Sequence, residues 1–313
     1  MPGFILLLTI GLLVFLAALT GYTAWVLTHP PRRTYASALA KGKPGDPGEL
    51  PPGPRGPRTW SAWMLAWRGL QLPVWDLAGD DPSGPVFVLS HGWGDSRIGG
   101  LTRAAYLLPL ASRVILWDMP GHGEAPGVCT LGTREPEALR ALIERVGCAA
   151  PIVLYGWSLG AGVSIACAAM PDGPPPGLLP RIGGVVAEAP YRLAATPARN
   201  VLESWALPWR INLPLALGLL GMRFGVGWTW RGFDRLEHAG RLRVPLLVLH
   251  GVEDAISPVQ DGRDLVRAAA LGRMVELPAG HHGIWTDPAT AETAAAAARG
   301  FVATMADART PDG

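Results

Sequence analysis

The sequence predicts an α/β fold: a mostly parallel, doubly wound sheet with a small helical cap, preceded by a single transmembrane helix. Three features lead to this prediction. Residues 4–26 form a long apolar run without a charge, residues 41–58 are dense in proline and glycine, and short apolar runs alternate with helix-length segments from about residue 85 to residue 305. Such alternation is typical of right-handed β-α-β units, which build a mostly parallel sheet.

The apolar run FILLLTIGLLVFLAALTGYTAWV extends from Phe4 to Val26. As a helix it would be about 34 Å long, which is enough to cross a hydrocarbon core of about 30 Å. Tyr22 and Trp25 lie near one end, where amphipathic rings favour the membrane interface. A signal peptide is the alternative, but its apolar region usually has about 7–15 residues and follows a positive charge. We therefore expect a retained anchor over residues 1–30.

The segment after the anchor is predicted to be a linker. Residues 31–58 are too rich in proline and glycine to bury much surface, which favours a semi-extended chain. The globular domain is expected at 59–306, followed by a flexible tail at 307–313. The positive residues nearest the anchor all follow it, so the positive-inside rule predicts a cytoplasmic domain. These residues are Arg32, Arg33, Lys41 and Lys43.

Composition excludes several classes of protein. The 313 residues are 49% hydrophobic, enough for one large domain with a sizeable core. The net charge of +2 gives no electrostatic case for binding nucleic acid. Cys129, Cys148 and Cys167 match no metal motif, and their odd number argues against a disulfide framework.

Six apolar runs have the length of buried strands, and helical segments separate them. The expected strands are 85–90, 113–118, 151–156, 182–190, 244–251 and 273–279. The expected helices are 101–111, 133–147, 159–170, 261–272 and 289–305. Functional residues of such sheets gather at the carboxyl ends of the strands, which is where candidate residues should be sought.

Ser158 stands at such a strand end, in the stretch VLYGWSLGAGVS. A strand precedes it, a helix follows it, and Gly156 and Gly160 occupy the positions that a strained nucleophile turn keeps small. A serine nucleophile needs a histidine base, and that base needs a carboxylate. His281 and His282 follow the last expected strand, while Glu253 and Asp254 follow the one before. The order Ser, Asp, His along the chain is that of α/β hydrolases.

Five motifs together resemble the α/β-hydrolase superfamily over about residues 60–305, and the resemblance suggests a bacterial membrane-anchored enzyme of the esterase or lipase type. The motifs are HGWGDS, DMPGHG, GWSLG, HGVEDAISP and AGHHGIW. The resemblance implies Ser158 as nucleophile, Asp254 as acid and His281 as base, with backbone N–H groups of Trp93 and Leu159 forming the oxyanion hole. His282 is the alternative base.

Two further carboxylates lie at or just after the ends of expected strands. Glu188, at another strand end, is the alternative acid, and Glu253 is expected to be a solvated neighbour. His91, His122 and His250 are expected to order loops or pack.

The apolar segment 199–234, with four tryptophans, falls where the resemblance places a cap or lid. It is either an ordinary helix pair that packs on the sheet or a lid that receives an acyl chain or touches lipid. The resemblance implies a hydrolase of carboxylic esters, with a small-molecule ester as substrate and no metal or organic cofactor. A serine peptidase or amidase, and a non-catalytic binding protein on the same fold, are the alternatives.

Overall fold

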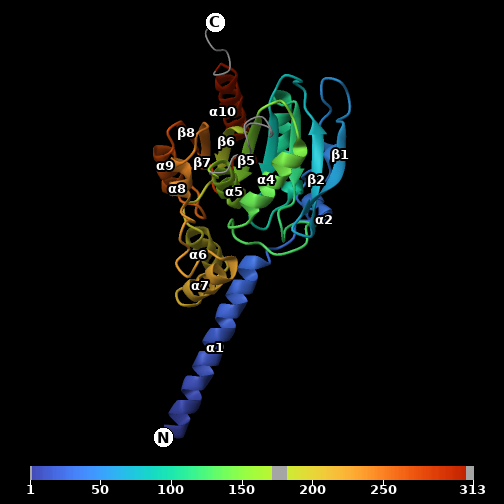
Figure 1. Ribbon diagram of the computed structural model, residues 1–313. Helices are drawn as coiled ribbons and strands as arrows, with labels where there is room; N and C mark the ends of the chain where they lie inside the picture. The colour runs from blue at the N-terminus through green and yellow to red at the C-terminus, as the bar shows by residue number, and fades with distance from the viewer. Residues whose placement is uncertain (1, 171–181, 308–313) are drawn as a thin grey trace.

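A central sheet of eight strands organises the computed structural model, which describes residues 2–170 and 182–307 (Figure 1). The strands lie in the order β1-β2-β4-β3-β5-β6-β7-β8. From β4 to β8 all neighbours are parallel, while β2 pairs antiparallel with both β1 and β4. The expected mostly parallel α/β sheet is confirmed. The strands are β1 Trp60–Trp67, β2 Leu70–Ala78, β3 Val86–Ser90, β4 Arg113–Trp117, β5 Ile152–Trp157, β6 Ile182–Glu188, β7 Leu246–Gly251 and β8 Gly272–Leu277.

Helices cover both faces of this sheet, which explains why its central strands are apolar on both sides. Along β3, Val86 and Val88 join the core that contains α4, α5 and α9, whereas Phe87 and Leu89 join the core that contains α3 and α10. The α-helices are α1 Pro2–Thr28, α2 Tyr35–Leu39, α3 Arg97–Leu107, α4 Glu135–Val146, α5 Leu159–Ala168, α6 Ala195–Ser204, α7 Asn212–Phe224, α8 Arg235–Gly240, α9 Val259–Ala268 and α10 Pro288–Asp307. Short 3-10 turns occur at Pro47–Glu49 and Leu108–Leu110.

The hairpin β1–β2 was not among the expected strands. Most of β1 is exposed or half-buried, and only Leu65 is buried, so its apolar pattern is weak. The two strands are joined by the two-residue turn Arg68–Gly69, in which both residues have positive φ, of 46° and 77°. Such a turn matches the twist of a two-stranded ribbon.

Residues 31–58 are not the semi-extended linker that their composition predicts. They contain α2 and the 3-10 turn at Pro47–Glu49, and they bury Ala38 and Leu50 against the domain. Arg58 also forms an ion pair with Asp80. Proline and glycine keep the helices of this segment short, but a few buried side chains and the Arg58 ion pair still hold the segment against the domain.

Helix α1 projects away from the domain, and its final turns pack against the cap helix α7 (Figure 1). Asn212 of α7 donates a side-chain hydrogen bond of 2.7 Å to Thr23 Oγ1, and the Cys129 N–H donates to the Thr28 carbonyl at 2.9 Å. Among the described residues, α1 is the one helix long and apolar enough to span a membrane.

A buried ion pair joins the helical layer to the sheet beneath the expected site. Arg103 of α3 donates from Nε to Glu188 at 2.7 Å, and the Tyr155 hydroxyl and the Trp285 indole donate to the same carboxylate at 2.6 and 2.8 Å. Burial alone would raise the pKa of Glu188, but Arg103 and these hydrogen bonds hold it below its ordinary value. Glu188 is therefore a structural carboxylate, whose oxygens accept from Arg103, Tyr155 and Trp285.

Replacing Glu188 by alanine should strongly destabilise the fold, because Arg103 would stay buried without its counter-charge. The expected loss is about 3–5 kcal/mol of unfolding free energy, measured by urea denaturation of the full chain in detergent. Glu276→Ala is the control, since that carboxylate pairs with Arg263 at the exposed surface and its loss should cost little. Equal effects of the two substitutions would contradict the role assigned to the buried pair.

Candidate active site

Ser158 lies on a strained turn between β5 and α5. Its φ of 51° and ψ of −114° place a non-glycine residue in a disfavoured region of backbone space. Such strain persists only where the surrounding structure enforces it, and it is common at functional sites. The turn presents the hydroxyl at the carboxyl edge of the sheet, as expected for a nucleophile elbow.

The glycines beside Ser158 are required by close backbone approach. A Cβ at Gly156 would lie 2.1 Å from the Gly160 carbonyl oxygen, and a Cβ at Gly160 would lie 1.9 Å from the Ser90 carbonyl oxygen. Any side chain at either position would push α5 away from β3 and β5. The G-x-S-x-G spacing thus follows from packing at this turn.

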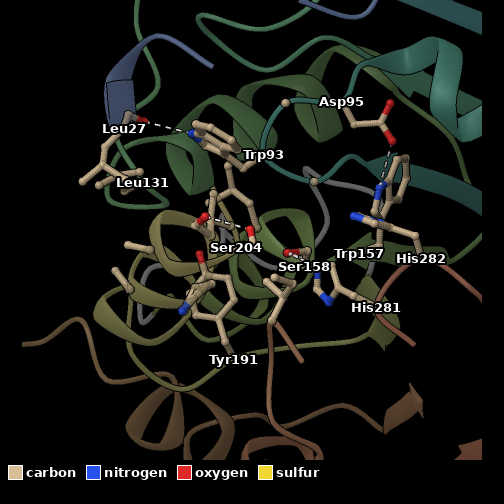
Figure 2. A pocket seen from close by; sticks show the side chains of 18 of the residues that line it. Leu27, Trp93, Asp95, Leu131, Trp157, Ser158, Tyr191, Ser204, His281 and His282 are labelled. Carbon is tan, nitrogen blue, oxygen red and sulfur yellow. Dashed lines mark hydrogen bonds between the residues drawn. The ribbon is translucent and has the colours of Figure 1, made fainter. Parts of the chain in front are cut away.

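The structure brings together the three residues that the sequence selected for the triad. His281 Nε2 lies 3.0 Å from Ser158 Oγ, and His281 Nδ1 lies 2.7 Å from Asp254 Oδ2 (Figure 2 shows the serine and the histidine). Ser158, Asp254 and His281 follow β5, β7 and β8, so three separate strand ends supply them. The serine hydroxyl, the imidazole and the carboxylate are thus linked by two consecutive hydrogen bonds.

Asp254 is held as a carboxylate by its surroundings. Its Oδ1 accepts hydrogen bonds from the Ile256 and Ser257 N–H groups, both at 2.8 Å, while Oδ2 contacts His281. Burial would raise its pKa, but contacts with His250 and His281 and the backbone donors hold that pKa well below its usual value. Asp254 is therefore ionised at neutral pH and can orient the imidazole.

The two adjacent histidines have different environments. His281 bridges Ser158 and Asp254, whereas the His282 ring packs against that of His281 with centroids 4.7 Å apart. Burial, then His281 and Arg103, lower the pKa of His282 to about 4, so its imidazole is neutral at physiological pH. The geometry favours His281 as the base.

The alternative acids lie elsewhere. Glu253 is exposed to solvent, and Glu188 is bound to Arg103. Asp254 is therefore the carboxylate that the structure aligns with the histidine.

The remaining strand-end histidines order the backbone. Buried His91 accepts from the Met119 N–H at Nε2 and donates from Nδ1 to the Gly92 carbonyl. His250 Nε2 contacts the Ser257 carbonyl oxygen at 2.8 Å, and buried His122 packs against His91 with ring centroids 4.8 Å apart. None of the three contacts Ser158.

The loop carrying Trp93 lies against the serine. A Cβ built at Gly92 would stand 3.5 Å from Ser158 Cβ, which brings the Trp93 backbone next to the nucleophile. Within the described chain, the N–H groups of Trp93 and Leu159 donate to no other group. Leu159 is also the first residue of α5, where the helix dipole favours negative charge. Both N–H groups thus belong to residues next to Ser158 and have no acceptor among the described residues.

A cavity of about 330 Å³ opens above Ser158, between the sheet and the cap (Figure 2). Val201 and Trp205 from the cap segment line it together with Ser158 and His281, and Tyr191 lines it as well. Leu27 of α1 also lines it, and its carbonyl accepts a 2.9 Å hydrogen bond from the Trp93 indole. The sequence did not indicate Leu27 as a site residue, because no local pattern shows that α1 reaches the site. It also did not indicate Tyr191, which follows β6.

In residues 2–170 and 182–307, no group of three or more His, Cys, Asp or Glu side chains is placed to hold a metal ion.

The sequence profile of the "Alpha/beta hydrolase family" matches residues 86–296, about two thirds of the chain. The chain belongs to this family. The match covers the segments that carry Ser158, Asp254 and His281 in this α/β hydrolase. No curated protein matches the chain.

Solved structures with the same fold include several esterases. An esterase from Pyrococcus furiosus, Pf2001, is 18% identical, with a TM-score of 0.64 over 88% of this chain and 98% of its own. A thermophilic esterase from Thermogutta terrifontis is 21% identical, with a TM-score of 0.56 over 79% and 99%. Est1E from Butyrivibrio proteoclasticus, solved with ferulic acid, is 17% identical, with a TM-score of 0.59 over 79% and 100%. At these identities the likeness supports the fold of this α/β hydrolase.

Deleting residues 2–28 of this α/β hydrolase should destabilise its domain. The deletion removes Leu27 from the cavity wall and the partners of Trp93, Asn212 and Cys129. We expect a fall of several degrees in the midpoint of thermal unfolding, measured in detergent.

Deletion of residues 2–12 is the matched control, because these residues are exposed and the buried turns of α1 remain. If both deletions leave the midpoint unchanged, the packing of α1 on the domain contributes nothing to stability.

Proposed function

We propose that this chain is a serine hydrolase that cleaves carboxylic esters through an acyl-enzyme. The observation that carries the proposal is the hydrogen-bonded series Ser158–His281–Asp254, with oxygen–nitrogen distances of 3.0 and 2.7 Å beside an apolar cavity. Ser158 Oγ attacks the acyl carbon while His281 Nε2 accepts its proton. Asp254 stabilises the imidazolium that forms.

The proposal continues through the tetrahedral intermediate. The N–H groups of Trp93 and Leu159 donate to its oxyanion, and preorganised donors of this kind contribute several kcal/mol of barrier reduction. His281 then delivers its proton to the leaving alcohol. A water molecule, activated by the same histidine, attacks the acyl-enzyme and releases the acid.

The proposal extends to location and domain organisation. We infer that residues 1–30 are a retained membrane anchor and that residues 59–306 form the hydrolase domain, with residues 31–58 packed upon it and a cap near 199–234. Thr23, Leu27 and Thr28 pack on the domain, an arrangement that a removed signal peptide would not maintain. The basic residues after the anchor favour a cytoplasmic domain. Residues 308–313, within the predicted tail, lie outside the described chain.

The test is covalent labelling of the full chain in detergent with a fluorophosphonate, followed by intact-mass analysis. We expect one adduct on the native chain and none on Ser158→Ala. His281→Ala should react at least about 10³-fold more slowly than the native chain, because the Ser158 hydroxyl loses its base. Asp254→Asn should also slow labelling strongly.

His282→Ala is the matched control, since His282 lies beside the base without contacting Ser158. It should label far faster than His281→Ala. A folded native chain that takes no adduct, or equal losses in the two histidine variants, would overturn the proposed triad. Turnover of ester and amide pairs that share one acyl group then decides the bond class.

A further inference from the structure

A second cavity, of about 280 Å³, adjoins the catalytic one. The two cavities share a wall formed by Trp93, Asp95, Trp157 and His282. The second one differs in charge, because four basic side chains from two distant segments line it. These are Arg33, Lys41 and Lys43, which follow α1, and Arg103 from α3.

The second cavity has more basic side chains than carboxylates paired with them. Arg103 is paired with Glu188, and Arg33 with Asp95 at 2.6 Å. Over the described chain, neither the Lys41 nor the Lys43 side chain forms an ion pair or a hydrogen bond. Asp95, which lines the cavity, and Glu188, which lies outside its lining, neutralise two of the four cations, so the charges of Lys41 and Lys43 remain uncompensated.

Two details show that this region has unused capacity for an anion. Arg33 Nε is buried and has no hydrogen-bond partner. The pKa of the half-buried Lys43 is lowered, first by burial and then by the neighbouring charges of Arg33 and Arg103. A bound anion would relieve this repulsion and give the guanidinium an acceptor.

We propose that this cavity binds an oxyanion, phosphate or carboxylate, carried by the ester on which Ser158 acts. This inference rests on the proposed function and deepens it, because it defines the substrate class as an ester with an anionic group. The reacting carbonyl would lie at Ser158, and the anion would lie in the adjoining cavity near Lys43 and Arg33, past the side chains that line both cavities. Substrates of this class include anionic lipids and small phosphorylated esters.

The test separates binding of the anion from hydrolysis. Inorganic phosphate is titrated calorimetrically into the full chain in neutral detergent. The native chain should bind it, and Lys41→Ala/Lys43→Ala should weaken binding at least 10-fold. Arg267→Ala, an exposed charge on α9, is the control and should bind as the native chain does. Absence of binding to the native chain, or equal binding by the lysine variant, would overturn the proposal.

The substrate arm uses pairs of esters with the same acyl group and either a neutral or a phosphorylated alcohol, tested both in solution and in vesicles. The lysine variant should raise KM for the phosphorylated ester about 10-fold relative to the neutral one. Preference for the vesicle form would identify a lipid headgroup as the source of the anion, and preference for the soluble form a free phosphate ester. Phosphate binding without any ester turnover would uphold the anion site and reject the proposed function.

A second and independent observation concerns the length of α1. Its first 14 described residues, 2–15, are exposed, and burial against the domain begins with the half-buried Leu16. At 1.5 Å per residue the free part is about 21 Å long, shorter than the hydrocarbon core of about 30 Å. If α1 spans a bilayer, its next turns must also lie in lipid, and this brings α7, which packs against α1, close to the bilayer.

The outward face of α7 suits that position. Leu219 and Met222 are 54% and 62% exposed, and Ile211, just before the helix, is 63% exposed. The exposed Arg210 and Arg223 lie near the two ends of the helix, where long basic side chains can reach headgroups. The face is apolar along its length and basic at its ends.

We infer that α7 lies in the membrane interface beside α1, with Leu219 and Met222 in contact with lipid. The cap would then hold the catalytic cavity at the bilayer surface. This surface is continuous with the proposed anchor and does not depend on the chemistry at Ser158.

The test is depth-dependent fluorescence quenching of the full chain in nanodiscs. Met222→Cys is labelled with bimane in a Cys148→Ser background, because Cys129 and Cys167 are buried. Lipids with a nitroxide on the acyl chain should quench this label strongly. Leu271→Cys, equally apolar and 57% exposed before β8, is the control and should be quenched little. Equal weak quenching at both positions would exclude immersion of α7.

Discussion

The site depends on how closely α5 approaches the ends of β3 and β5. With no side chain at Gly156 or Gly160, the helix begins against the Ser90 carbonyl, and the chain must turn sharply at Ser158. This single packing constraint places Ser158 at the turn between the end of β5 and the start of α5. The strain at Ser158 is maintained because the core on both faces of β5 is completely buried.

Buried charges hold the surrounding loops in place. Glu188 ends β6 and binds Arg103, Tyr155 and Trp285, so one carboxylate joins α3, β5 and the loop after His282. Asp254 plays a similar part on the other side, where backbone donors and His281 meet at one carboxylate. In each case burial disfavours the ion, and specific partners offset that cost. The ionised state and the loop geometry therefore depend on each other.

The chain before the sheet contributes to the candidate active site. Leu27 contributes both a side chain to the cavity and a carbonyl to the Trp93 indole, and Asn212 connects α1 to the cap. Residues 33–43 then pass along the neighbouring cavity and add its basic side chains. A segment whose composition predicts an anchor and a linker thus lines part of both cavities. This arrangement connects the proposed membrane anchor directly to the proposed site of ester cleavage.

The sequence by itself determined the parallel α/β sheet, the elbow at Ser158 and the candidates Asp254 and His281, because each depends on local patterns: apolar runs of strand length, glycines at fixed spacing, and polar residues directly after strands. Only the tertiary structure decided the rest. The ring positions that bring His281, and not His282, to Ser158 and Asp254 are set by packing. Strand β1 lies at the edge of the sheet, and of its side chains only Leu65 is buried. The fold of residues 31–58 and the place of Leu27 in the cavity depend on contacts between residues up to about a hundred positions apart. Local periodicity carries no information about such contacts, so no reading of these segments alone could have predicted them.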